Sequence, residues 1–123
     1  MDDATTAIRV VLGEDDAAVR AMLADVLAES GFDVVGVGAD GREALELALA
    51  LTPDAVLLDV RMPQLSGIEA ARAIRAAGRK VRIVMHSAYD DASLRAEAAE
   101  AGADAYLVKG AALPELAAAL RGH

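Results

Sequence analysis

Short apolar runs and longer amphipathic stretches alternate five times along the chain. The runs are rich in Val, Leu and Ile, which is typical of strands buried on both faces, whereas the stretches between them place apolar residues at helical spacing. The expected strands are residues 8–12, 32–37, 55–59, 81–87 and 105–108. A helix is expected after each strand, and these helices end near Gly31, Leu51, Gly78, Gly102 and Leu120.

Turn and capping residues separate the expected elements. Asp40 and Glu43 have the spacing of a capping box, and Asp90 or Asp91 can cap the fourth helix. Pro114 falls in the first turn of the last helix, where its missing N–H is harmless. Because the connections are short, consecutive strands are expected to run parallel. The sequence therefore predicts an α/β fold of βαβ units, with right-handed crossovers and helices on both faces of one sheet.

Composition narrows the class of protein. The 123 residues suffice for one domain, which we expect to occupy residues 1–123 with a core of about 8–121 and no output domain. No stretch has the length of a membrane span, the acidic start is unlike a signal peptide, and cysteine is absent. These features favour a soluble, cytoplasmic protein. A net charge of −8 and an aromatic content of 2% argue against direct binding of nucleic acid.

Polar residues follow four of the expected strands. Glu14 and Asp15 follow the first, Asp59 ends the third, Ser87 ends the fourth and Lys109 follows the fifth. The carboxyl ends of parallel strands share one edge of the sheet, where such folds bind ligands. Converging carboxylates repel one another and favour a bound Mg²⁺ or Mn²⁺, while a lysine and a hydroxyl can hold phosphoryl oxygens. The pattern predicts phosphoryl transfer with Asp59 as the nucleophile.

With these residues, the chain resembles the receiver domain of bacterial two-component response regulators, including the stand-alone chemotaxis type. The resemblance extends from about Ile8 to Leu120. It rests on separate motifs in the same order: Glu14-Asp15, Asp59 with Arg61-Met62-Pro63 and Gly67, Ser87-Ala88, Gly102-Ala103-Asp104-Ala105-Tyr106, and Lys109. It implies a single doubly wound, flavodoxin-like (βα)5 domain with the strand order 2-1-3-4-5.

The resemblance also implies a role for each matching residue. Asp59 would accept a phosphoryl group from a histidine kinase or phosphotransfer protein. Mg²⁺ would bind Asp15, Asp59 and the backbone carbonyl of Arg61, with Glu14 acting directly or through water. The remaining matches are two phosphoryl contacts (Ser87 and Lys109), an aromatic switch that follows Ser87 (Tyr106), and two positions that tune dephosphorylation (Arg61 and Tyr89).

The signal would pass through the face formed by the fourth helix, fifth strand and fifth helix to a downstream protein or an output domain. The expected protein is a monomer or a phosphorylation-dependent homodimer that contacts neither nucleic acid nor a membrane. It would catalyse only its own phosphorylation and dephosphorylation.

Three positions depart from the family's usual residues. Glu14 replaces the commoner Asp, Ser66 stands where Asp or Asn is usual before Gly67, and Gly110 follows Lys109 where proline is commonest. A cis bond after Lys109 is therefore an open question, since a non-proline cis bond costs about 2.5–4 kcal/mol. Asp16, next to the acid pair, is expected to cap the first helix.

Three other functions compete with this hypothesis. A receiver fold that has lost phosphorylation would act only as a binding module. A phosphatase of the haloacid dehalogenase type would need a second Asp two residues after Asp59, where this chain has Arg61. A flavodoxin-like FMN protein would need a hydroxyl- and glycine-rich phosphate loop after the first strand, where Glu14, Asp15 and Asp16 would repel the phosphate.

Overall fold

Strands and helices alternate along residues 7–122, the part of the chain that the computed structural model describes. The strands are β1 (Arg9–Gly13), β2 (Asp33–Gly38), β3 (Ala55–Asp59), β4 (Arg82–Ser87) and β5 (Ala105–Val108). The helices are α1 (Ala17–Glu29), α2 (Gly41–Leu51), α3 (Gly67–Ala76), α4 (Ala92–Glu100) and α5 (Leu113–Arg121). The predicted elements are confirmed, with strand boundaries that shift by at most one residue.

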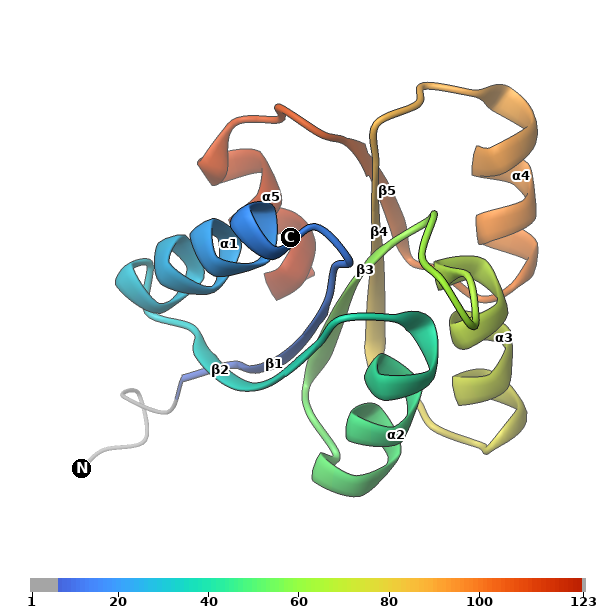
Figure 1. Cartoon of the computed structure of the whole chain (residues 1–123), viewed down its shortest axis with the longest axis horizontal. Helices are drawn as coiled ribbons and strands as arrows, with labels where there is room; N and C mark the ends of the chain where they lie inside the picture. The colour runs from blue at the N-terminus through green and yellow to red at the C-terminus, as the bar shows by residue number, and fades with distance from the viewer. Residues whose placement is uncertain (1–6, 123) are drawn as a thin grey trace.

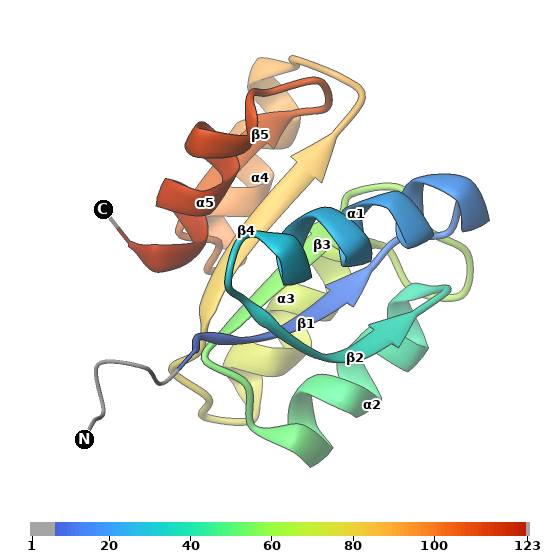
Figure 2. The ribbon, with the colours of Figure 1, turned by 90° about the vertical axis from the view of Figure 1, so that its left-hand side faces the viewer.

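All five strands lie parallel in one sheet, in the order β2-β1-β3-β4-β5 (Figure 2). This confirms the predicted α/β class and strand order. The central strand β3 is buried along its whole length, as expected for a run covered on both faces. Within the described residues no helix is both long and apolar enough to cross a membrane.

Helices cover both faces of the sheet (Figure 1). One face carries α2, α3 and α4, and its core includes Val56, Leu58, Ile74 and Met85. The other face carries α1 and α5, and its core is built around residues such as Leu57. Alternate residues of β3 thus point to opposite cores, as the two-residue period of a strand requires.

The register of the sheet brings the carboxyl ends of four strands to one edge. Asp59, the last residue of β3, pairs with His86 of β4, and the next residue of β4, Ser87, pairs with Val108 of β5. On the other side, Gly13 of β1 pairs with Leu58 of β3. The residues that follow β1, β3, β4 and β5 are therefore neighbours at what we call the carboxyl edge.

The helix caps match the sequence in most places. Asp16 caps α1, and Asp91, rather than Asp90, caps α4. Asp40 accepts the Glu43 N–H as predicted. The Glu43 carboxylate, however, accepts the N–H of Ala39 instead of the N–H of the cap residue Asp40, so the capping box is incomplete. A complete capping box forms instead at the start of α3, between Ser66 and Glu69.

The opposite edge, the amino edge, carries arginines that donate to main-chain carbonyls near helix ends. Near the C-terminal end of each of the five helices, an arginine side chain binds at least one main-chain carbonyl. The pairs are Arg121 with Ser30, Arg9 with Thr52, Arg79 with Leu49, Arg75 with Arg79, Val81 and Gly102, and Arg82 with Ala119. These contacts satisfy carbonyls that a helix leaves free at its C-terminus, and they place positive charge where the helix dipole is negative.

Candidate functional site

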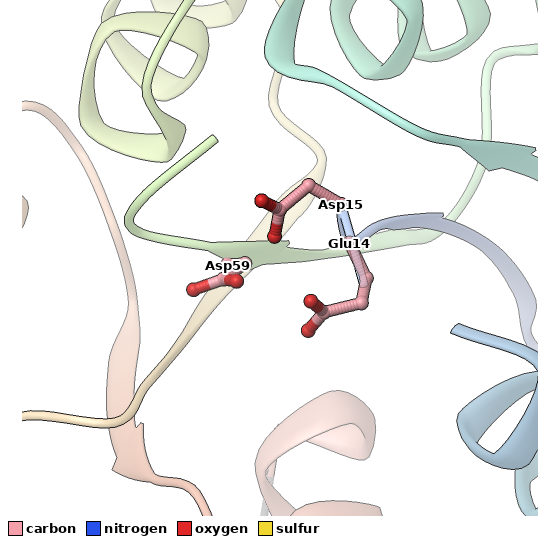
Figure 3. Close-up of side chains that lie close together, drawn as sticks. All are labelled: Glu14, Asp15 and Asp59. Atoms are coloured by element: carbon pink, nitrogen blue, oxygen red, sulfur yellow. The ribbon is translucent and has the colours of Figure 1, made fainter. Parts of the chain in front are cut away.

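Three carboxylates meet at the carboxyl edge: Glu14 and Asp15 from the loop after β1, and Asp59 from the end of β3 (Figure 3). One oxygen of each lies within 4.8 Å of the others. Glu14 and Asp59 are buried, whereas Asp15 is exposed to solvent. The sequence predicted this convergence from the common edge of parallel strands, and the structure brings the three side chains together.

Glu14 is the most deeply buried of the three, with 1% of its surface exposed. Its Oε2 accepts the N–H of Asp16 at 3.1 Å, whereas Oε1 is buried and finds no partner in hydrogen-bond geometry among residues 7–122. Burial raises the pKa of Glu14 above its usual value, and the hydrogen bond from Asp16 and the approach of Lys109 oppose that rise. The site therefore holds a carboxylate oxygen that lacks a complete set of partners.

Lys109 extends from the turn after β5 to two of the carboxylates. Its Nζ lies 3.0 Å from Asp59 Oδ2, in a hydrogen bond, and 3.1 Å from Glu14 Oε1, close enough for ion pairing. Burial favours the neutral amine, but the two carboxylates outweigh it and raise the pKa of Lys109. The lysine is thus a fixed positive charge beside Asp59.

The carboxylate group fits a hard divalent cation. Mg²⁺ and Mn²⁺ prefer oxygen ligands, and the site supplies oxygens from Glu14, Asp15 and Asp59 within a small volume. Glu14 Oε1 gives a second reason, since among the described residues its one close partner is the Lys109 ammonium at 3.1 Å, and a buried acceptor that is only partly satisfied can take a further ligand. The backbone of Arg61 contributes an N–H to Asp59 Oδ1 at 3.3 Å.

Ser87 and Tyr89 lie beside this group rather than inside it. Ser87 is buried at the end of β4, and its Oγ accepts the N–H of Tyr89 at 3.0 Å. The Arg61 guanidinium stacks over the exposed Tyr89 ring, 4.9 Å from the ring centre. The two positions named from the family resemblance as tuning residues are therefore in contact with each other.

Tyr106 is half-buried on β5 and contacts the loop after β4 that carries Tyr89. Its hydroxyl donates to the Tyr89 carbonyl at 2.8 Å. The Arg95 guanidinium covers its ring at 4.8 Å and pairs with Asp90 at 2.8 Å. Sequence analysis missed Arg95, because nothing in the local pattern of α4 shows that its side chain packs on a ring from β5.

A groove of about 730 Å³ opens beside Asp15, between the loop after β3 and helices α3 and α4. Met62, Pro63 and Leu94 supply apolar surface, while Asp15 and Arg61 lie on its polar side. The groove reaches the site at Asp15, whereas the buried Asp59 does not line it.

Comparisons with known proteins agree with this arrangement. A sequence model of the response regulator receiver domain matches residues 10–121. The chain is 43% identical over 118 residues to the transcriptional regulatory protein PdtaR of Mycobacterium tuberculosis, covering 96% of this chain and 57% of that protein. It is 44% identical over 114 residues to the response regulator MprA of Mycolicibacterium vanbaalenii, covering 93% and 49%. The chain therefore spans about half the length of these relatives.

Solved structures give the same result. The signal receiver domain of the response regulator NarL from Mycobacterium tuberculosis superposes with a TM-score of 0.89 at 34% identity, covering 95% of this chain and 98% of that one. The response regulator domain of CheB from Thermotoga maritima gives a TM-score of 0.84 at 33% identity, covering 95% and 96%.

Proposed function

The chain belongs to the response regulator receiver domain family, and from this premise we propose that Asp59 accepts a phosphoryl group and makes the domain a switch. The observation that carries the proposal is the position of Asp59, which lies between two other carboxylates and a lysine ammonium 3.0 Å away. Phosphoryl transfer depends mainly on positioning and on neutralising charge, and this group supplies both.

The donor is a phosphohistidine of a histidine kinase or phosphotransfer protein. A carboxylate oxygen of Asp59 attacks phosphorus, and the phosphorus–nitrogen bond breaks. The electron pair stays on the imidazole nitrogen, and Asp59 becomes an acyl phosphate. Hydrolysis reverses the state: a water oxygen attacks phosphorus, inorganic phosphate leaves, and the Asp59 carboxylate is restored.

Three carboxylates and one main-chain group of this chain would hold the metal: Glu14, Asp15, Asp59 and the backbone carbonyl of Arg61. Bound Mg²⁺ would supply positive charge that offsets the charge spread over the phosphoryl oxygens. Asp15 is exposed and can approach a cation from the solvent side, while Glu14 offers its buried Oε1, now beside Lys109, from the protein side.

Lys109 neutralises the remaining charge. Its ammonium holds Asp59 in place before transfer and can bind a phosphoryl oxygen afterwards, as a point charge on a flexible stem. Ser87 would donate its hydroxyl hydrogen to another phosphoryl oxygen. The Ser87 Oγ accepts the Tyr89 N–H, and this bond leaves the hydroxyl hydrogen available as a donor.

The response would spread from Ser87 to the surface. A phosphoryl group adds about −1.5 to −2 charge near neutral pH, which attracts the hydroxyl and the ammonium toward it. A shift of Ser87 would move the Tyr89 backbone, to which the Tyr106 hydroxyl is bonded, and so change the face formed by α4, β5 and α5. Arg61 and Tyr89 would set the lifetime of the acyl phosphate.

We place the domain, residues 1–123, in the cytoplasm, where it would receive phosphoryl groups from a kinase. The output would be a contact with a downstream protein or an attached domain, made as a monomer or as a phosphorylation-dependent dimer. Direct contact with nucleic acid or a membrane is not part of the proposed role. The domain would turn over no substrate besides its own acyl phosphate.

Intact-mass spectrometry after incubation with acetyl phosphate tests the proposal. The wild type should gain one phosphoryl group with Mg²⁺ present and none with a chelator, and Asp59→Asn should gain none. Asp16→Asn is the matched control, since Asn caps a helix as well as Asp does and the variant should react normally. A wild type that gains no adduct under any condition would favour a phosphorylation-independent binding module.

A further inference from the structure

The turn that carries Lys109 depends on one glycine. Gly110 has a φ of +98°, and the N–H of Ala111 donates to the Val108 carbonyl at 3.1 Å. This hydrogen bond closes a four-residue β-turn, residues 108–111, in which Lys109 is the second residue and Gly110 the third. Among the residues that the structure describes, the only non-glycine residues with positive φ are Thr52 and Gln64, so the φ of Lys109 is not positive. Positive φ at the third position alone is typical of a type II turn, which strongly favours glycine there.

The turn fixes the backbone of Lys109 from both sides. Its N–H donates to the Ser87 carbonyl at 2.6 Å, which ties the end of β5 to the end of β4. C-terminal to Lys109, the conformation of Gly110 sets the direction of the chain. Between these two constraints, the side chain reaches Asp59 and Glu14.

We propose that Gly110 is a positioning residue for phosphoryl transfer, because its left-handed conformation holds Lys109 over Asp59. This inference rests on the proposed function of Asp59. An L-side chain at residue 110 would disfavour positive φ and push the turn toward another conformation. The displacement would start at the residue adjoining Lys109 and would move its ammonium away from the carboxylates.

Crowding is not an alternative cause of such an effect. Within residues 7–122, and apart from the residues adjoining Gly110, no heavy atom lies within 4 Å of the position that a Cβ on Gly110 would occupy. The consequence of a substitution would therefore come from the backbone dihedral alone. Side chains that tolerate the left-handed region should be accepted, and β-branched side chains should be the worst.

A series of substitutions at residue 110 tests this inference through the rate of phosphorylation by acetyl phosphate with saturating Mg²⁺. Since misplacing a catalytic group by 1 Å can cost about 10²-fold, we expect Gly110→Ala to slow the reaction about tenfold and Gly110→Val to slow it more. Gly110→Asn should restore most of the rate, because Asn visits the left-handed region readily. Mg²⁺ affinity should not fall, since Lys109 is not a metal ligand and its ammonium competes with a cation for Glu14 and Asp59.

Gly31 provides the matched control. It has a φ of +93°, equally open surroundings and an exposed position, but it follows α1 at the amino edge. Gly31→Ala should strain the backbone to a similar degree and leave the phosphorylation rate unchanged. Equal slowing by Gly31→Ala and Gly110→Ala would overturn the inference, because the effect would then follow general destabilisation.

A second measurement separates this inference from a failure of the proposed function. In a Lys109→Gln background, Gly110→Ala should cause no further slowing, because the group that Gly110 positions is gone. Additive effects of the two changes would contradict the inference while leaving Asp59 as the acceptor. A wild-type chain that takes up no phosphoryl group would instead refute the proposed function itself.

Discussion

The two edges of the sheet differ in what their charged side chains bind. At the amino edge, Arg75 alone donates to the carbonyls of Arg79, Val81 and Gly102, so its charge is used to complete the backbone. At the carboxyl edge, the carboxylates of Glu14 and Asp59 face Lys109 and each other, and the buried Glu14 Oε1 has, among the described residues, only the Lys109 ammonium beside it. Charge that is satisfied internally stabilises the fold, whereas charge that is only partly satisfied is available to a ligand.

The difference is a consequence of helix direction. Every helix in this fold returns from the carboxyl edge to the amino edge, so the C-terminal carbonyls of all five gather at the amino edge. Arginine forks suit these carbonyls because each offers several donors in a fixed plane. The carboxyl edge receives the helix N-termini, which favour anionic groups, and there the chain has Asp and Glu in its loops.

The largest expected effect comes from removing a carboxylate at the carboxyl edge. Loss of a supporting group around a metal costs about 10–100-fold in affinity, so Asp15→Asn should weaken Mg²⁺ binding by at least about 100-fold. Isothermal titration of Mg²⁺ measures this. The control is Asp16→Asn, which removes a neighbouring charge but keeps the α1 cap. Equal losses in the two variants would mean that net charge, rather than a ligand at Asp15, governs binding.

A change at the amino edge should affect stability without affecting phosphorylation. Arg75 is 26% exposed and donates to three carbonyls and Asp104, so Arg75→Met should lower the free energy of unfolding by about 2 kcal/mol. Urea denaturation gives the stability, and the acetyl phosphate assay gives the rate. Arg72→Met, an exposed change on the same helix, is the control and should cost little. A slower reaction in Arg75→Met would show that the two edges are not independent.

Ser66 lies near the carboxyl edge but is expected to act only on stability. Its hydroxyl accepts the N–H of Glu69, and the Glu69 carboxylate accepts the N–H of Ser66. Ser66→Ala should therefore cost about 1 kcal/mol of unfolding free energy, and Ser66→Asn should preserve the cap. Chemical denaturation of the three proteins decides this. Loss of stability in Ser66→Asn as well would indicate that the serine does more than cap α3.

The smallest expected effect is a dependence of stability on pH that originates at the carboxyl edge. Burial, and then the charge of Lys109, lower the pKa of His86 below its usual 6.5. As the pH falls below 6.5, the unfolded chain takes up this proton before the native one, so the stability that His86 contributes is lost. Glu14 opposes the trend, since its raised pKa makes the native state bind a proton first and gain stability on acidification.

Unfolding free energies of the wild type and His86→Gln between pH 7.5 and 5.5 isolate the histidine. The wild type should lose more stability across this range than the variant. Parallel curves for the two proteins would mean that His86 titrates alike in the folded and unfolded chain. Arginine keeps its charge across this range, so the amino edge should add no slope.

The fold could be predicted from the sequence because its signals are local and repeated. The run Ala55–Leu58 is apolar on both sides of the strand, and Asp59 follows it directly, so both the buried strand and its polar end are visible in one stretch. The convergence of Glu14 and Asp15 with Asp59 then follows from topology alone, since parallel strands end at one edge. No side-chain geometry is needed for that step.

Contacts that depend on side-chain reach could not be predicted. Arg75 binds the Gly102 carbonyl across 27 residues of sequence, and Lys109 divides its ammonium between Asp59 at the end of β3 and Glu14 in the loop after β1. Such contacts are set by how helices pack, which periodicity does not encode. The open question after Lys109 is answered by the structure: no cis bond occurs within residues 7–122, and Gly110 makes the turn through positive φ instead.

The most direct test of the central claim is to locate the phosphorylated residue. Borohydride reduces an aspartyl phosphate to homoserine, so treatment of the protein after reaction with acetyl phosphate and Mg²⁺ marks the acceptor permanently, and peptide sequencing by mass spectrometry identifies it. We expect homoserine at residue 59 and at no other carboxylate. Homoserine at residue 15 or elsewhere, with Asp59 intact, would contradict the claim.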